Sequence, residues 1–272
     1  MGKSVWFPTG ALWIRSFPLR FLRVRRLGYL ATLISLPACA LAEEPGGLQI
    51  PATSHSAAAT PGLQRLEKAN GALLYVPQSY RANEALPLLI LLHRSGGNAS
   101  HWFSSSHKEI PGSFAPRADA GRFVILAPAS PGTTWGVGPR AWGSDVVSIN
   151  RAIAEAFSHC AIDQNRVAIG GFSDGASYAL SLGLANGDRI RAVVAFSPGF
   201  IVKARGRGRP GLFISHGRED FVLPIDTASR LFVRQLQKNG YTIDYHEFDG
   251  GHGVPPAICA QAMSWLAAQF RR

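Results

Sequence analysis

The sequence is poor in cysteine, with three among 272 residues. This number excludes a small scaffold held together by many disulfides. The two that follow residue 42, Cys160 and Cys259, lie far apart in the chain, and neither has a metal-ligand pattern beside it. We expect both to be buried free thiols, with a disulfide between them as the alternative, and we expect no metal site.

Acidic residues are missing from the first 42 positions, which contain six lysines and arginines. Removing these six from the formal net charge of +11 leaves 22 basic and 17 acidic residues, a net charge of +5. Because much of the excess belongs to one end of the chain, we expect no nucleic-acid partner. A second basic cluster contains Lys203, Arg205, Arg207 and Arg209. It predicts a solvated loop, with weak contact to an anionic surface as the alternative.

The chain also lacks a long hydrophobic run near its start. A basic stretch, Arg23–Arg26, precedes the apolar segment Leu27–Leu36, which is shorter than the ~20 residues of a membrane span. Ala40–Ala42 then forms an A-x-A cleavage pattern. We predict that residues 1–42 are a signal peptide and that the mature chain, beginning at Glu43, is periplasmic or secreted. A twin-arginine signal and a lipoprotein anchored at Cys39 stay open as variants of this route.

The remaining chain divides into a tether and one domain. Residues 43–62 are rich in Pro, Gly, Ala, Ser and Thr and predict a flexible tether. From residue 63 to 272, strand-like apolar runs alternate with helical patterns. The expected strands are Leu73–Val76, Leu88–Leu92, Phe123–Ala127, Val167–Gly170, Ala192–Phe196, Leu212–Ser215 and Thr242–Phe248, and the expected helices are Val146–Phe157, Ala176–Ala185, Thr227–Lys238 and Pro256–Phe270. This alternation predicts an α/β domain with a mostly parallel sheet, flanked by helices and without a large cap.

A candidate nucleophile lies near the middle of the chain. Gly171-Phe172-Ser173-Asp174-Gly175 follows a strand-like run and precedes a helix-like one. A sharp turn between strand and helix exposes a serine hydroxyl, and the flanking glycines permit the close packing that such a turn requires. The motif alone occurs often by chance, and Ser173 could simply be a helix cap.

A carboxylate and a histidine follow Ser173 in the order Ser, acid, His. Asp220 comes after a buried strand, where the carboxyl ends of parallel strands gather functional groups. His252 lies between glycines, before the last helix. We expect His252 to act as the base and Asp220 to orient it, with Glu219 and Asp226 as competing carboxylates.

These stretches together resemble the α/β-hydrolase superfamily, and within it the lidless carboxylesterase and phospholipase branch, near secreted polyhydroxyalkanoate depolymerases and feruloyl-type esterases. The resemblance covers residues 75–270 and depends on Leu91-Leu92-His93, Gly96-Gly97-Asn98, Ala127-Pro128, Gly171–Gly175, His216-Gly217 through Asp220, and Gly251-His252. It implies a serine hydrolase of small-molecule or polymeric carboxylic esters that forms an acyl-enzyme and uses no cofactor. A catalytically impaired binding module, or an exported serine peptidase or acyltransferase, are the alternatives.

The oxyanion hole requires two backbone N–H groups. One is expected from Asp174, and the other from Arg94 or Ser95 in the loop after Leu88–Leu92. Members of this superfamily usually have glycine where this chain has Arg94. If the position needs a positive φ, arginine adopts it under strain. The other interpretation places a cation at the cleft, where it would pair with an anionic group of the substrate.

Four aromatic residues lie in loops that follow predicted strands. They are Trp102, Phe103, Trp135 and Trp142. Loops of this kind reach the rim that carries Ser173, so we expect these side chains to bind substrate, with packing inside the loops as the alternative.

Overall fold

The computed structural model describes residues 46–53, 59–106, 108–136, 142–202 and 205–272. Residues 43–272 form one compact unit. The predicted signal peptide, including Cys39, lies outside the described residues, as does Lys203. Within the described part of the chain, no helix has the length and apolar character needed to cross a membrane.

The unit is built on an eight-stranded sheet with the order β1-β2-β4-β3-β5-β6-β7-β8. The strands are β1 Gly62–Arg65, β2 Leu73–Val76, β3 Leu86–Leu92, β4 Val124–Ala127, β5 Ile162–Phe172, β6 Ala192–Phe196, β7 Gly211–Gly217 and β8 Ile243–Phe248. Strand β2 runs antiparallel to both β1 and β4, and every other neighbouring pair is parallel. The prediction of a mostly parallel sheet is therefore confirmed.

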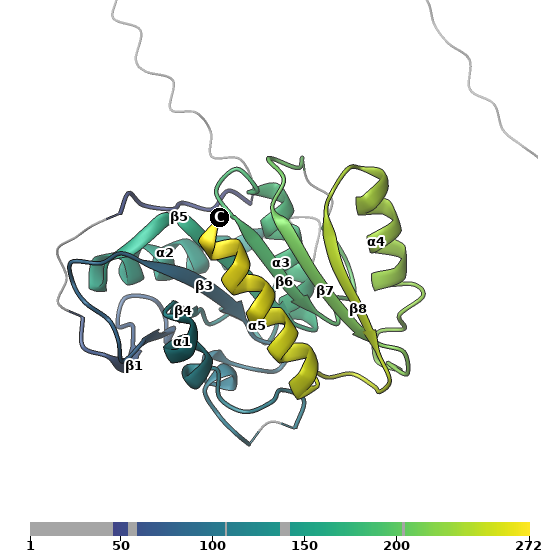
Figure 1. The fold of residues 1–272 in the computed structure, drawn as a ribbon, viewed down its shortest axis with the longest axis horizontal. Helices are drawn as coiled ribbons and strands as arrows, with labels where there is room; N and C mark the ends of the chain where they lie inside the picture. The colour runs from purple at the N-terminus through teal and green to yellow at the C-terminus, as the bar shows by residue number, and fades with distance from the viewer. Residues whose placement is uncertain (1–45, 54–58, 107, 137–141, 203–204) are drawn as a thin grey trace, which may run out of the picture. The chain divides into compact units, whose positions relative to one another are not determined.

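Helices cover both faces of the sheet. They are η1 Ala99–Trp102, α1 Ala115–Gly121, α2 Gly143–His159, α3 Asp174–Ala185, α4 Ser229–Lys238 and α5 Pro256–Arg271. Figure 1 shows α5 in front of the sheet, with α2 and α3 behind it. In β3, Leu88 and Ile90 pack in the cluster that contains residues of α2, α3 and α4, whereas Leu89 and Leu91 pack with α1 and α5. This alternation explains why β3 is apolar throughout, because both faces of the strand are covered.

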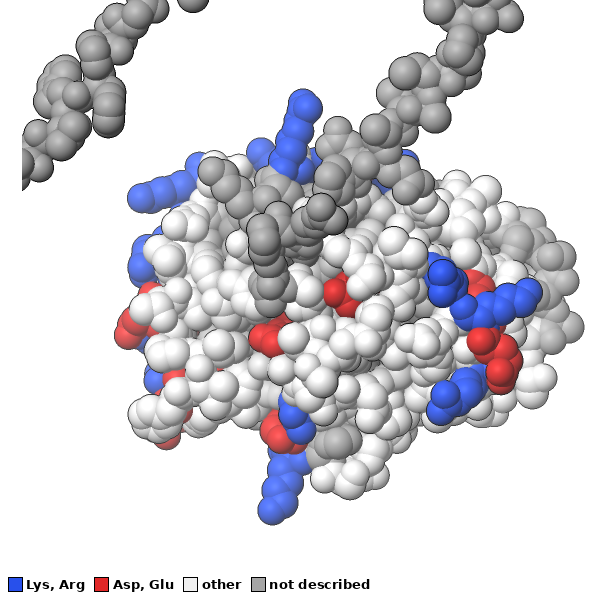
Figure 2. Space-filling view, turned by 180° about the vertical axis from the view of Figure 1, so that it is seen from behind, with Lys and Arg blue, Asp and Glu red and all other residues white. Residues whose placement is uncertain are grey.

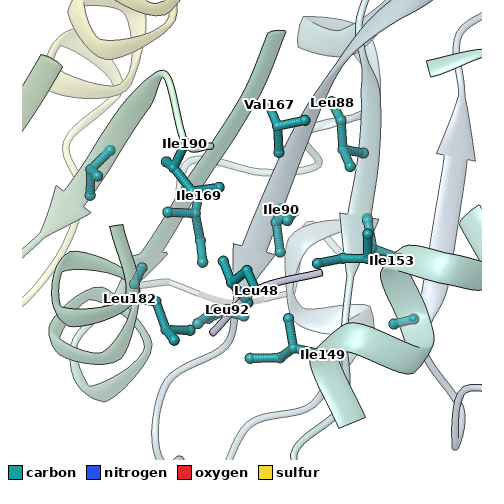
Figure 3. Packing of buried hydrophobic residues seen from close by; sticks show 14 of the residues in the cluster. Leu48, Leu88, Ile90, Leu92, Ile149, Ile153, Val167, Ile169, Leu182 and Ile190 are labelled. Atoms are coloured by element: carbon teal, nitrogen blue, oxygen red, sulfur yellow. The ribbon is translucent and has the colours of Figure 1, made fainter. Parts of the chain in front are cut away.

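The segment before β1 corrects the prediction of a flexible tether. Leu48 is 2% exposed and belongs to the core beside α2 and α3, as Figure 3 shows. The buried Asn186 accepts a hydrogen bond from the Leu48 N–H at 2.8 Å and donates one to the Gly46 carbonyl at 2.8 Å. Asn150 makes two further hydrogen bonds, to the Gln49 N–H and the Gly47 carbonyl, so residues 46–53 are attached to the domain although their composition is typical of a linker.

Both described cysteines are buried free thiols, as predicted. Cys160 ends α2, and Cys259 lies in the first turns of α5. Burial raises the pKa of the Cys160 thiol to about 12 and that of Cys259 to about 11. Both thiols therefore stay protonated and unreactive near neutral pH.

Candidate active site

Ser173 occupies a strained turn between β5 and α3. Its φ of 59° and ψ of −123° lie outside the regions that side-chain-bearing residues ordinarily adopt. The Ser173 N–H donates to the carbonyl of Phe196 at the end of β6, 2.9 Å away. This bond to the neighbouring strand holds the turn in place, and strain of this kind is common at functional sites.

Two glycines are required for this turn. A Cβ on Gly171 would lie 2.5 Å from the carbonyl carbon and oxygen of Gly175. A Cβ on Gly175 would lie 2.2 Å from the carbonyl oxygen of Leu92, at the end of β3. The absence of both side chains therefore allows α3 to approach the loop that follows β3.

The His252 imidazole connects Ser173 to Asp220. Its Nε2 lies 2.8 Å from Ser173 Oγ, and its Nδ1 lies 2.6 Å from Asp220 Oδ2. Because the carboxylate accepts the Nδ1–H, Nε2 is left to accept the serine proton. The ring of Phe172 packs against the imidazole, with a centroid distance of 4.8 Å.

Asp220 is the one carboxylate of the three candidates that reaches the imidazole. It is 4% exposed, and its second oxygen accepts the N–H groups of Val222 at 3.0 Å and Leu223 at 2.8 Å. Glu219 is exposed, and Asp226 forms an ion pair with Arg230 at 2.9 Å. The turn after β7 therefore fixes Asp220 in one orientation.

His216 lies beside Asp220 and is completely buried. Its Nε2 donates to the carbonyl of Leu223 at 2.8 Å and is also 3.2 Å from Asp220 Oδ2. Its Nδ1 accepts from the Ser229 hydroxyl at 2.7 Å. Burial lowers the pKa of His216, so the ring is neutral at neutral pH. The contacts of this ring stabilise the turn that contains Asp220.

The loop after β3 approaches the amino end of α3. Here the N–H of Asp174 belongs to the first turn of a helix, where N–H groups have no partner within the helix. In the β3 loop, Gly96 donates to Thr133 and Gly97 donates to the Arg94 carbonyl. Among the described residues of this loop, the N–H groups of Arg94, Ser95 and Asn98 have no acceptor.

His93 holds this loop in shape. Its Nδ1 donates to the carbonyl of Arg94 at 2.8 Å, and its Nε2 accepts from the Ser130 N–H at 3.2 Å. Burial lowers the pKa of His93, and only the neutral ring can make both contacts. The Trp135 indole N–H donates to the His93 carbonyl at 2.7 Å, and this bond also holds His93 in place.

Arg94 does not adopt a positive φ, so the prediction of strain at this position is wrong. The non-glycine residues with positive φ in the described chain are Asn70, Arg122, Ser173 and Ser197. The Arg94 guanidinium instead lies 3.8 Å from Glu109 and donates to the Ser95 carbonyl at 2.9 Å. The Glu109 carbonyl accepts the N–H of Val254 at 2.8 Å. Arg94 and Glu109 therefore connect the β3 loop to the loop that carries His252.

The expected aromatic wall is not present at the rim. Trp102 and Trp135 are fully buried and Trp142 is 8% exposed. Trp102 packs against Phe114, and Trp135 and Trp142 pack against Tyr178 of α3. Phe103 is half-buried and lies near Tyr75. The three indoles therefore belong to the core of the domain.

Sequence reasoning missed two exposed apolar side chains beside Asp220. Phe221 is 91% exposed and Val222 is 66% exposed. The available signal was an apolar pair directly after the charged residues Arg218–Asp220. Phenylalanine is usually buried, so its place in a charged turn was unusual. A pocket of about 510 Å³ has His252 in its lining, together with residues 108–109, 111 and 248–256. Open space therefore adjoins the imidazole.

The geometry is that of a serine hydrolase of the α/β-hydrolase fold, and comparison with known proteins agrees. The model of the phospholipase/carboxylesterase family matches residues 144–270. This stretch includes Ser173, Asp220 and His252. The match, over a little less than half of the chain, supports the similarity to the carboxylesterase and phospholipase branch of the α/β hydrolases.

Curated relatives and solved structures extend this match. "Probable feruloyl esterase C" of Aspergillus flavus is 30% identical over 62% of this chain. The match covers 61% of that relative. The protein of the same name from Aspergillus terreus is 26% identical over 72% of this chain and 73% of its own length. A ferulic acid esterase of Anaeromyces mucronatus, solved with ferulic acid, has a TM-score of 0.61 and 18% identity over 82% of this chain and 98% of its own. At that identity the structural likeness concerns the fold.

Proposed function

We propose that the protein hydrolyses carboxylic esters, with Ser173 as the nucleophile. Ser173 Oγ attacks the ester carbonyl while His252 Nε2 takes the serine proton. The new Oγ–carbon bond forms, the bond to the alkoxy oxygen breaks, and the alcohol leaves with the proton from His252. Water then attacks the acyl-enzyme by the same route and releases the carboxylic acid. The observation that carries this proposal is the continuous hydrogen-bonded chain from Ser173 through His252 to Asp220.

Two backbone donors are the proposed oxyanion hole. The Asp174 N–H lies at the positive end of the α3 dipole, which favours a developing negative charge. The second donor is the N–H of Arg94 or Ser95, since the loop engages those of Gly96 and Gly97. The intact set of nucleophile, base, acid and donors supports an enzyme over an impaired hydrolase fold that only binds.

We propose aromatic acid esters of the feruloyl type as the substrate class. The names of the Aspergillus relatives support this choice, and so does the exposed apolar pair Phe221 and Val222, which follows Asp220 in the chain. A planar aromatic acyl group gains free energy from contact with such side chains. An ester with a charged acyl group gains less, because Arg94 already faces Glu109.

A matched set of substrates tests this function. Methyl ferulate, p-nitrophenyl acetate, p-nitrophenyl octanoate and the amide of ferulic acid should be compared by kcat/KM. We expect hydrolysis of the esters, with methyl ferulate preferred to the octanoate, and no turnover of the amide. The Ser173→Ala variant is the control for contaminating esterases. Turnover of the amide at a rate similar to the ester would instead indicate a peptidase.

Export is the second part of the proposal. It is supported by the succession of basic, apolar and A-x-A segments within residues 1–42. Mass spectrometry of the natively expressed protein should find an N-terminus near Glu43. A chain that retains Arg25 would contradict export by cleavage, and a diacylglyceryl group on Cys39 would identify a lipoprotein.

A further inference from the structure

A second pocket lies at the end of the sheet opposite Ser173. Its volume is about 830 Å³, and its wall includes Asn165 of β5, Arg191 just before β6, Gly211 of β7 and Ile243 of β8. All of these positions are at the amino ends of their strands. Asn165 and Ser173 are eight residues apart along one strand, a span of roughly 25 Å. A ligand in this pocket therefore does not touch the candidate active site.

Four arginines line the pocket. They are Arg189, Arg191, Arg209 and Arg272. Three have contacts that fix their direction: Arg191 Nε donates to the Gln269 carbonyl at 2.7 Å, Arg189 donates to the Leu48 carbonyl at 3.3 Å, and Arg209 lies over the Tyr241 ring at 4.5 Å. These groups are held in place before any ligand arrives, which lowers the entropic cost of binding.

None of the four forms a salt bridge with a carboxylate of the described residues. Among the other described arginines, Arg94, Arg122, Arg166, Arg218 and Arg230 each have an acidic partner, whereas Arg151 and Arg234 form no salt bridge with a described carboxylate. Two carboxylates also line the pocket, and one of them, Asp244, is engaged by His246 at 2.8 Å. The lining side chains therefore carry four positive and two negative charges, a net charge of about +2.

The uncharged part of the wall indicates what kind of anion fits. It includes the amides of Gln164, Asn165 and Gln269, the hydroxyl of Thr242 and the partly buried indole of Trp265, beside aliphatic residues and glycines. Amides and hydroxyls both donate and accept hydrogen bonds, as sugar hydroxyls do, whereas a phosphate needs donors alone. An indole provides a flat apolar surface for the face of a sugar ring.

We infer that this pocket binds an acidic oligosaccharide, a sugar chain that carries carboxylates. The arginines pair with the carboxylates, and the amides and Trp265 contact the sugar rings. On the face shown in Figure 2, blue side chains gather toward the upper edge, the edge where the amino ends of these strands lie in Figure 1. Of the basic cluster noted in the sequence, Arg209 lines the pocket, and Arg205 and Arg207 are exposed nearby in the chain.

Calorimetric titration of the full exported protein tests the inference. The probes are trigalacturonate, the neutral trisaccharide maltotriose and inorganic phosphate. The pocket variant is Arg189→Gln with Arg209→Gln. Its control is Arg151→Gln with Arg234→Gln, which removes the same charge from exposed positions on α2 and α4. Near-UV circular dichroism verifies that each variant is folded.

We expect trigalacturonate to bind in a 1:1 complex, more tightly than either other probe. The pocket variant should bind it at least about tenfold more weakly, since each charge-assisted hydrogen bond contributes roughly that factor. The control variant should stay within about twofold of the natural protein, because distant exposed charges are screened. Equal weakening in both variants would overturn the inference, as would undetectable binding of trigalacturonate. Phosphate binding as tight as that of trigalacturonate would show a simple anion site and overturn it too.

Discussion

His216 Nε2 lies 3.2 Å from Asp220 Oδ2, the same oxygen that lies 2.6 Å from Nδ1 of His252. One carboxylate oxygen therefore faces two imidazoles. The contacts of His216 with Leu223 and Ser229 keep its ring in place on the buried side. A neutral His216 adds no positive charge beside Asp220. In the proposed mechanism, the Asp220 carboxylate then stabilises the imidazolium that forms on His252.

The burial of His216 and His93 predicts a loss of stability in mild acid. Burial lowers the pKa of each ring in the folded protein below its ordinary value of 6.5. The unfolded chain therefore binds more protons, and the stability that is complete above pH 6.5 falls as the pH drops toward the folded pKa values. The slope is at most about 1.4 kcal/mol per pH unit for each histidine.

Urea unfolding at pH 5, 6, 7 and 8 measures this slope. The His216→Gln variant should be less stable at pH 8, since it loses buried hydrogen bonds, and its stability should depend less on pH between 5 and 7. An unchanged slope in the variant would show that His216 does not titrate on unfolding in this range.

The orientation of Asp220 predicts which carboxylate matters for the rate. Asp220→Asn should leave the protein folded and lower kcat by roughly 10⁴-fold, because the amide favours the wrong imidazole tautomer. Glu219→Gln and Asp226→Asn are the matched controls, since neither side chain contacts His252. We expect each control to stay within about threefold of the natural kcat, as for surface charges in general. A loss in Asp226→Asn as large as in Asp220→Asn would contradict the assignment.

The close approach of Gly175 to β3 predicts a steric effect. Its Cβ in Gly175→Ala would lie 2.2 Å from the Leu92 carbonyl oxygen, so the turn and the β3 loop must separate. We expect a less stable protein, by about 1–3 kcal/mol, with kcat/KM reduced at least about tenfold. At Gly132 the nearest atom to a new Cβ is 3.6 Å away, so Gly132→Ala is the control. If thermal melts and ester hydrolysis gave the same melting temperature and the same kcat/KM for both variants, this steric explanation would be wrong.

The attachment of residues 46–53 predicts a stability effect of Leu48. Leu48→Ala leaves a cavity beside α2 and α3 and should lower the free energy of unfolding by about 2–4 kcal/mol. Leu63→Ala removes the same atoms at a position that is 50% exposed and should cost much less. Equal midpoints of denaturation for the two variants would restore the interpretation of this segment as a tether.

The central strands were predictable because their sequence is apolar on both faces. The expected strand Ala192–Phe196 has the observed bounds, and Leu88–Leu92 is short of β3 by two residues. The edge strand Gly62–Arg65 was missed, because its alternating polar residues give it no apolar run. The helix Ala115–Gly121 is short and buries little, so its pattern was too weak to detect.

At the site, chain order predicted which side chains meet, and the loops determined the rest. Ser173, Asp220 and His252 each follow the carboxyl end of a strand, so the topology brings them to one edge of the sheet. The burial of Trp102 and Trp135 depends on how their loops fold back, which no local pattern encodes. The ion pair between Arg94 and Glu109 joins two loops, so it could not be predicted from the sequence before the fold was known.

Covalent labelling of Ser173 is the most direct test of the account. The protein is treated with a serine-directed fluorophosphonate, its intact mass is measured, and the modified residue is mapped by peptide sequencing. We expect one adduct per chain on Ser173, none in Ser173→Ala, and much slower labelling in His252→Ala, because the base activates the hydroxyl. An adduct that persists in Ser173→Ala, or that maps to another serine, would contradict the assignment of Ser173 as the nucleophile.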